Sequence, residues 1–253
     1  MAEIDRLRRE IVIASARAGE GHIPSALSIL DILWIEYSVI MANQRARHEE
    51  IDRFVLSKGH GSLALYVVLS EIGVIDKSEL SSFGQFDSRL GGHPDRLKIP
   101  GVEASTGSLG HGMPIAAGIA LAKQIQGSEG RVVVLIGDGE ANEGTIWETA
   151  LIAAHRQLTN LVCVVDYNHS TDRALLVGSI ADKFAAFDWN VLEIDGHNRY
   201  EIEESLSRKA TTRPLAIIAN TIKGKGVKAM ENNPAWHHAA PKGDEVENLL
   251  GDN

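Results

Sequence analysis

The tetrapeptide Gly137-Asp138-Gly139-Glu140 has the residue types needed to bind a phosphate group through a metal ion. Glycine lets the backbone approach a ligand closely, and the amides that enter a helix attract an anion. The Asp138 carboxylate would repel a bare phosphate, but a divalent cation such as Mg²⁺, which prefers oxygen ligands, would remove that conflict. An Asp-Gly pair is also a common turn, so the tetrapeptide alone does not decide between the two interpretations.

A second candidate ligand, Asn168, follows Asp138 after 30 residues. The apolar runs 131–136 and 161–166 are typical of strands buried on both faces, and residues 143–157 between them are predicted to be helical. A right-handed strand–helix–strand unit places its two strands side by side, and ligands bind outside the carboxyl ends of such strands. The spacing therefore predicts that one cation contacts both side chains.

The wider pattern predicts a single α/β domain over residues 1–253, with a parallel sheet flanked by helices on both faces and a helical N-terminal region. Ser25 is the expected N-cap of a buried helix. Residues 81–108 lack periodicity and are expected to form a functional loop, and the polar tail 232–253 is expected to be irregular. Further expected elements are helices at 4–18, 27–40, 62–73, 112–126 and 200–210, and strands at 191–194 and 215–219.

Composition excludes several classes of partner and compartment. The formal net charge of −9 is spread along the chain without a basic cluster, which argues against nucleic acid. The single cysteine, Cys163, is expected to be a small buried hydrophobic residue and permits no internal disulfide. The charged N-terminus lacks the apolar core of a signal peptide, and no apolar stretch approaches the roughly 18 residues that span a bilayer. We therefore expect a cytoplasmic protein without membrane association.

Six segments together resemble the transketolase family in sequence and in order. They are VVLIGDGEANEGTIWETALIAAHRQLTNLVCVVDYN (133–168), RFVLSKGHGSLALY (53–66), GGHPD (91–95), GVEASTGSLGHG (101–112), EIDGHN (193–198) and NTIKGKGV (220–227). The resemblance covers nearly the whole chain. It implies the diphosphate-binding (PP) domain of the thiamine diphosphate fold.

The resemblance implies which residues hold the cofactor. Asp138, Asn168 and the backbone carbonyl of Ser170 would bind Mg²⁺, and Ca²⁺ or Mn²⁺ would fit the same oxygens. A lone histidine between glycines, such as His60, is often a plain loop residue, and here the surrounding match favours a functional role. The residues expected to contact thiamine diphosphate are His60, Gly107, Ser108, Leu109, Gly137, Asp138, Gly139, Glu140, Asn168 and His237.

On the reactive side of the cofactor, the resemblance implies His22, His93, Glu143 and His237. Imidazole suits this work because its pKa lets it donate or accept a proton near neutral pH. Glu143 would lie at a subunit interface, and it is also a favourable acid in a first helical turn. His238 is the alternative to His237, which is preferred because a tryptophan precedes it.

Some residues depart from the family pattern or keep two interpretations. The segments EGHIPSA (20–26) and HSTDRALLVG (169–178) differ from the usual family sequences, and these differences bear on substrate preference more than on metal binding. Lys223 and Lys225 either neutralise phosphate or lie in a solvated loop. His48 and His155 are expected at the surface.

Two-carbon ketol transfer by a transketolase needs a glutamate that activates the cofactor, and in the family this glutamate lies on a second, pyrimidine-binding domain. A chain of 253 residues leaves no room for that domain. The resemblance therefore implies a separately encoded C-terminal subunit, an α2β2 assembly and no activity of the chain alone. The alternatives are a specialised enzyme that acts on an unusual sugar or forms another acyloin, and a subunit that only binds cofactor.

Overall fold

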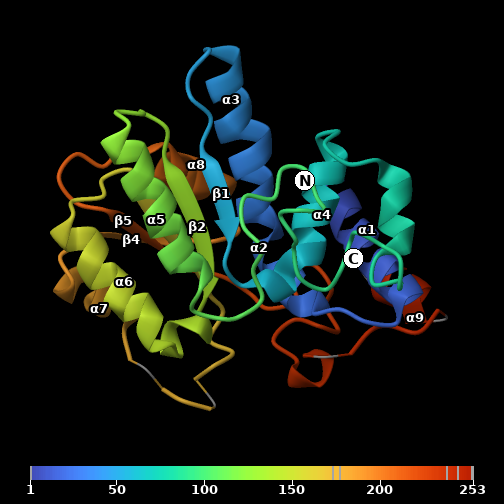
Figure 1. The fold of residues 1–253 in the computed structure, drawn as a ribbon. Helices are drawn as coiled ribbons and strands as arrows, with labels where there is room; N and C mark the ends of the chain where they lie inside the picture. The colour runs from blue at the N-terminus through green and yellow to red at the C-terminus, as the bar shows by residue number, and fades with distance from the viewer. Residues whose placement is uncertain (1, 173, 177, 238, 244, 252–253) are drawn as a thin grey trace.

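The computed structural model describes residues 2–172, 174–176, 178–237, 239–243 and 245–251. Within them lies one five-stranded sheet in the order β1-β2-β3-β5-β4, and all of its neighbouring strands are parallel (Figure 1). The strands are β1 (Arg53–Leu56), β2 (Val132–Gly137), β3 (Leu161–Tyr167), β4 (Asn190–Asp195) and β5 (Leu215–Asn220). The predicted fold class, a parallel α/β sheet, is confirmed.

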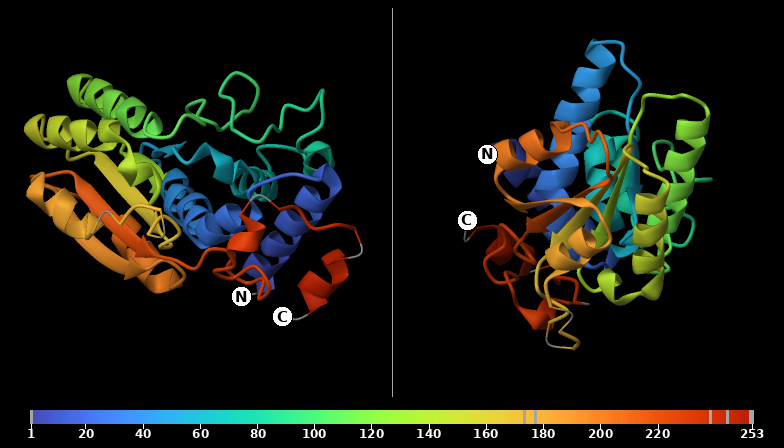
Figure 2. Two further views of the ribbon diagram at one scale, coloured as in Figure 1. Left: turned by 90° about the horizontal axis from the view of Figure 1, so that it is seen from below. Right: turned by 90° about the vertical axis from the view of Figure 1, so that its left-hand side faces the viewer.

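Helices cover both faces of the sheet because its central strands are apolar on both sides. Val133 and Leu135 of β2 face one core, whereas Val132, Val134 and Ile136 face the other. Figure 2 shows the blue N-terminal helices on one side of the sheet and the green helices on the other. The first core is formed with α1 (Ala2–Ala18), α2 (Ile23–Ile35), α4 (Ser62–Glu71) and α8 (Arg199–Ser207), and the second with α5 (Gly112–Ile125), α6 (Gly144–His155) and α7 (Ile180–Ala186).

One local expectation for the N-terminal half is wrong, and one strand was not predicted. Ser25 is not an N-cap: α2 begins at Ile23 after His22, because Pro24, whose backbone angle is already helical, fits the first turn and leaves Ser25 buried inside the helix. The predicted helical N-terminal region is present, and it also contains β1, a strand of four residues at the edge of the sheet. So short a strand shows too little alternation to be separated from its helical neighbours.

Two segments expected to be irregular are more structured than their composition indicates. Residues 83–111 contain no helix or strand, but they bury Leu90, Ile99 and Val102 in the first core. The polar tail contains helix α9 (Glu245–Gly251), which buries Leu249 and Leu250 against α1. Tertiary burial of a few apolar side chains therefore orders polar segments that lack a periodic pattern.

One continuous helical run, Ile23–Ala46, is long and apolar enough to cross a membrane, contrary to the expectation that no apolar stretch approaches that length. It comprises α2, the π-helix Glu36–Ile40 and α3 (Met41–Ala46). Its 18-residue window has a mean hydropathy of 1.5, and 72% of that window is buried in the protein. The helices that form the core of a globular protein have the same properties, so the run is weak evidence for a membrane span.

Candidate active site

A cavity of about 330 Å³ lies at the carboxyl ends of β2 and β3. Because parallel strands end at one edge of the sheet, their following loops meet there, as the strand–helix–strand spacing predicted. Most of the residues singled out in the sequence line it. The lining residues are His22, Ser25, Lys58, His60, His93, Gly107, Leu109, Gly137, Asp138, Gly139, Glu140, Asn168, Ser170, Lys223 and His237.

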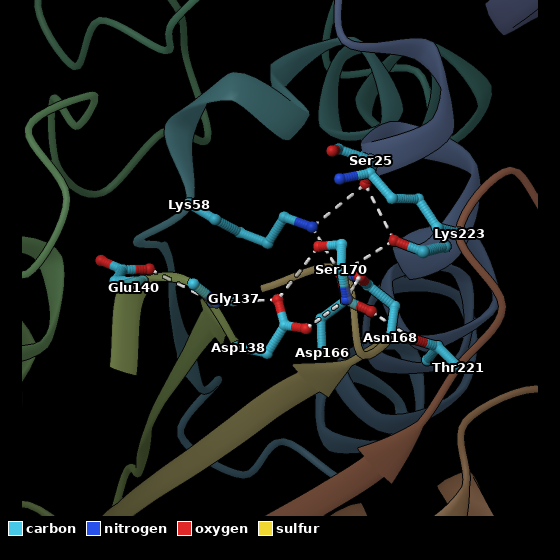
Figure 3. A network of polar contacts seen from close by, with 12 residues as sticks. Ser25, Lys58, Gly137, Asp138, Glu140, Asp166, Asn168, Ser170, Thr221 and Lys223 are labelled. Carbon is cyan, nitrogen blue, oxygen red and sulfur yellow. Dashed lines mark hydrogen bonds and ion pairs between the residues drawn. The ribbon is translucent and has the colours of Figure 1, made fainter. Parts of the chain in front are cut away.

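The three predicted metal ligands meet around one backbone amide (Figure 3). The Ser170 N–H donates to Asp138 Oδ2 at 2.9 Å and to Asn168 Oδ1 at 3.1 Å. The Gly139 N–H donates to Asp138 Oδ1 at 2.7 Å. The oxygens of Asp138 and Asn168 therefore lie close together and face the cavity.

The charge balance at Asp138 fits a bound cation. Burial, followed by the nearby Asp166, raises the pKa of Asp138, because its ionised form is desolvated and repelled. A divalent cation would offset both the desolvation of the Asp138 carboxylate and its repulsion by Asp166. Oxygen atoms of Asp138 and Asn168 would coordinate the cation. Among the described residues, no three His, Cys, Asp or Glu side chains form a metal-binding cluster, so a metal here would need amide, carbonyl or phosphate oxygens as well.

A buried ion pair beside the predicted metal ligands was missed by the sequence analysis. Lys58 follows β1 and Asp166 lies near the end of β3, and their Nζ and Oδ2 atoms are 2.5 Å apart, with side chains 2% and 0% exposed. Burial acts to raise the pKa of Asp166, but Lys58 and the hydroxyl donors Thr221 and Ser28 hold it below its ordinary value. The available signal was an aspartate in the apolar run LVCVVDY, because a charge is rarely buried without a partner.

Glu140, which was predicted to contact the cofactor, lines the cavity, and its carboxylate accepts hydrogen bonds from the protein. It accepts hydrogen bonds from Ser57 Oγ at 2.5 Å, from the Gly110 N–H at 2.9 Å and from the Gly137 N–H at 3.3 Å. Burial raises the pKa of Glu140. The side chain therefore ties the loop that contains Gly110 to the ends of β1 and β2, in addition to lining the cavity.

Three histidines line the same cavity as the predicted metal ligands. The ring of His22 lies 5.0 Å from that of His60 and 5.9 Å from that of His237. Burial, then Lys58 and His22, lowers the pKa of His60 to about 2. His60 is therefore neutral at physiological pH and offers one ring N–H and one acceptor nitrogen.

Lysine and histidine side chains complete the rim of the cavity. Lys223 Nζ lies 3.0 Å from His237 Nδ1, and burial lowers the pKa of Lys223. This position favours the interpretation of Lys223 as a phosphate-facing cation over that of a solvated loop residue. His93 is exposed and packs over Gly107, where φ is +145° and an added Cβ would lie 2.9 Å from the His93 ring. His238 lies outside the described residues.

Two predicted site residues, Ser108 and Glu143, are exposed and do not line the cavity. Ser108 Oγ lies 3.2 Å from His111 Nδ1, and Glu143 occupies the N-cap position of α6 beside Gly110. The exposure of Glu143 is compatible with its expected place at a subunit interface.

The fold and the cavity define a parallel α/β protein with a candidate binding site at the carboxyl edge of its sheet. The family described as "Transketolase, thiamine diphosphate binding domain" matches residues 2–251. The chain therefore belongs to the transketolase family, and the predicted resemblance is confirmed.

Relatives of this chain include short transketolase subunits. It is 40% identical to a subunit of the apulose-4-phosphate transketolase of Actinobacillus succinogenes, over 96% of this chain and 92% of that protein. It is 37% identical to a 6-deoxy-6-sulfo-D-fructose transketolase subunit of a Clostridium species, over 88% of this chain and 84% of that protein. The transketolase structure from Leishmania mexicana matches with a TM-score of 0.87 and 27% identity, over 99% of this chain and 42% of that one. This chain thus corresponds to less than half of that transketolase.

Proposed function

We propose that this chain is the diphosphate-binding, N-terminal subunit of a two-subunit transketolase that uses thiamine diphosphate and Mg²⁺. The observation that carries the proposal is the cavity in which Asp138 and Asn168 share the Ser170 N–H beneath three histidines. The subunit names of its short relatives support a separate partner. In this proposal, residues 1–253 form one domain with a polar tail at 232–253, and an α2β2 assembly acts in the cytoplasm.

Each part of the cavity has a role in binding. Asp138, Asn168 and the Ser170 carbonyl would hold the metal, with Ca²⁺ and Mn²⁺ as possible substitutes for Mg²⁺. Lys223 places positive charge where a diphosphate would lie, and neutral His60 can donate a hydrogen bond to an anionic oxygen. Gly137 and Gly139 have no side chain, so the cofactor can approach their backbone closely. Gly107 and Leu109 line the same cavity.

The substrate side of the cavity is formed by imidazole groups. Thiamine diphosphate, when bound, supplies a nucleophilic carbon and an electron sink for breaking a bond beside a carbonyl. His22, His93 and His237 would hydrogen-bond the sugar hydroxyls and carry protons to and from them. Glu143, exposed beside Gly110, would face the partner subunit, which supplies the glutamate that activates the cofactor.

We propose that the enzyme accepts an unusual ketose as donor, in addition to or in place of the common ketose phosphates. Two short relatives carry names that refer to apulose-4-phosphate and 6-deoxy-6-sulfo-D-fructose. The altered sequences 20–26 and 169–178 border the cavity through His22 and Ser170, so they are placed to change substrate contacts. Whether the donor is an unusual ketose or a common ketose phosphate, the reaction transfers a two-carbon ketol unit from a ketose to an aldose.

The chain alone should convert no ketose, whereas a mixture with its partner should turn over. The purified chain, the product of a neighbouring reading frame that encodes a pyrimidine-binding domain, and their mixture would each be assayed with thiamine diphosphate and Mg²⁺. A panel containing xylulose 5-phosphate, apulose 4-phosphate and 6-deoxy-6-sulfofructose would identify the donor. Turnover by the chain alone would contradict the two-subunit proposal. Failure of the mixture with all donors, despite cofactor binding, would favour a subunit that only binds cofactor.

A further inference from the structure

The Asp166 carboxylate accepts hydrogen bonds from four side chains, and one of them is the proposed metal ligand Asn168 (Figure 3). Its Oδ2 atom accepts from Lys58 Nζ at 2.5 Å, from Ser28 Oγ at 2.8 Å and from Asn168 Nδ2 at 2.9 Å. Its Oδ1 atom accepts from the Thr221 hydroxyl. These donors come from α2, from the loops after β1 and β5, and from the loop after β3, so the carboxylate joins the segments that build the floor of the cavity.

The orientation of the Asn168 carboxamide decides whether it can bind a cation. One end of the group is a hydrogen-bond acceptor and the other is a double donor, and only the oxygen end is a ligand for a hard cation. In the structure Asn168 Nδ2 is bound to Asp166, and Asn168 Oδ1 accepts from the Ser170 N–H, which also donates to Asp138. A carboxylate has no hydrogen to donate, so Asp166 accepts only the NH₂ end and leaves the oxygen on the Asp138 side.

Lys58 compensates the negative charge of the buried Asp166 carboxylate. Asp166 has a fully buried side chain, and an uncompensated carboxylate there would be strongly unfavourable. The Lys58 ammonium binds the same oxygen that holds Asn168 and also donates to the Ser25 carbonyl at 3.3 Å. The pair therefore brings no net charge next to Asp138.

We propose that Asp166, paired with Lys58, is a positioning residue that orients Asn168 so that its amide oxygen faces the metal. The inference rests on the proposed function, because it assigns no metal site other than that of Asp138, Asn168 and Ser170. Residues that hydrogen-bond to a metal ligand without contacting the metal typically lower metal affinity by about 10- to 100-fold when they are replaced.

The proposal is tested by titrating Mn²⁺ into the full chain with inorganic pyrophosphate as the anionic probe. Asp166→Asn should weaken Mn²⁺ binding by about 10- to 100-fold, since an amide can present either end to Asn168. The double variant Lys58→Met/Asp166→Leu removes both buried charges, a change that folded proteins often tolerate, and it should lose a similar factor. Ser28→Ala is the matched control: it deletes one donor to Asp166 and should retain affinity within about 3-fold, because Asn168 keeps its partner.

A second measurement separates positioning from general loss of structure. If Asn168 no longer offers its oxygen, a water molecule takes its place on Mn²⁺, so the water-proton relaxation rate per bound ion should rise in both variants and stay unchanged in Ser28→Ala. Normal affinity and relaxation in folded Asp166→Asn, or in the double variant if the single one does not fold, would overturn the inference and leave the proposed function intact. Equal Mn²⁺ binding by the unaltered chain and by Asp138→Ala would overturn both.

Discussion

Replacing Asp138 with asparagine is expected to lower the Mg²⁺-dependent affinity for thiamine diphosphate by more than about 100-fold. This loss exceeds the one expected for a residue that only hydrogen-bonds to a metal ligand. The carboxylate is the only charged side chain among the three proposed ligands, and its raised pKa reflects a buried position that a cation would relieve. Asparagine keeps the size and one oxygen but removes the negative charge that attracts the metal. Isothermal titration of the cofactor into the chain with its partner, with and without Mg²⁺, measures the change.

Asp172→Asn is a matched control for that experiment. Asp172 lies in the loop after β3, pairs with His169 through Oδ2 at 2.9 Å and does not line the cavity. The control loses the same charge and should bind the cofactor with nearly unchanged affinity. Equal affinities of the unaltered chain and Asp138→Asn would remove Asp138 from the metal site.

Glu36→Gln is expected to stabilise the protein at alkaline pH and to have little effect near pH 5. Glu36 lies in the π-helix Glu36–Ile40 with a fully buried side chain, and neither of its carboxylate oxygens has a hydrogen-bond partner among the described residues. Burial, then repulsion from Asp52, raises its pKa to about 8. Arg131, the neighbouring cation, is already paired with Asp52.

The direction of the pH effect follows from proton linkage. The folded state retains the Glu36 proton up to about pH 8, whereas the unfolded chain releases it near pH 4.5. The unfolded state therefore gains relative stability as the pH rises between these two values. Glutamine mimics the protonated side chain, so the gap in unfolding free energy between variant and parent should widen by about 3 kcal/mol from pH 5 to pH 8.

Thermal unfolding of both proteins at several pH values checks this prediction. The widening of the free-energy gap corresponds to a shift in Tm of about 6 to 12 °C for a chain of this length. Glu129→Gln, at an exposed position between β1 and β2 in the chain order, changes the same group without burial and should show no such trend. A constant difference between Glu36→Gln and its parent from pH 5 to pH 8 would mean that Glu36 is ionised in the folded protein.

The amino-acid sequence by itself was sufficient to predict the parallel α/β fold and the heart of the site. Asp138 and Asn168 end successive strands that are joined by one helix, and such a unit has one preferred hand and strand arrangement. Their proximity therefore follows from local connectivity, and the structure joins both through Ser170. The short edge strand β1 and the start of α2 at Ile23 were missed because each depends on a few residues with no lasting period.

Only the tertiary structure decided what surrounds those two residues. Lys58 and Asp166 are 108 positions apart, and Ser57 and Glu140 are 83 apart. No local period relates such pairs, because they meet through strand order and helix packing across the whole sheet. Hydrogen-bond geometry also distinguished two acidic residues of the turn at 137–140. Asp138 shares the Ser170 N–H with Asn168, whereas Glu140 accepts hydrogen bonds from Ser57 and Gly110. Sequence indicated where the proposed metal–phosphate site lies, and three-dimensional packing determined which side chains surround it.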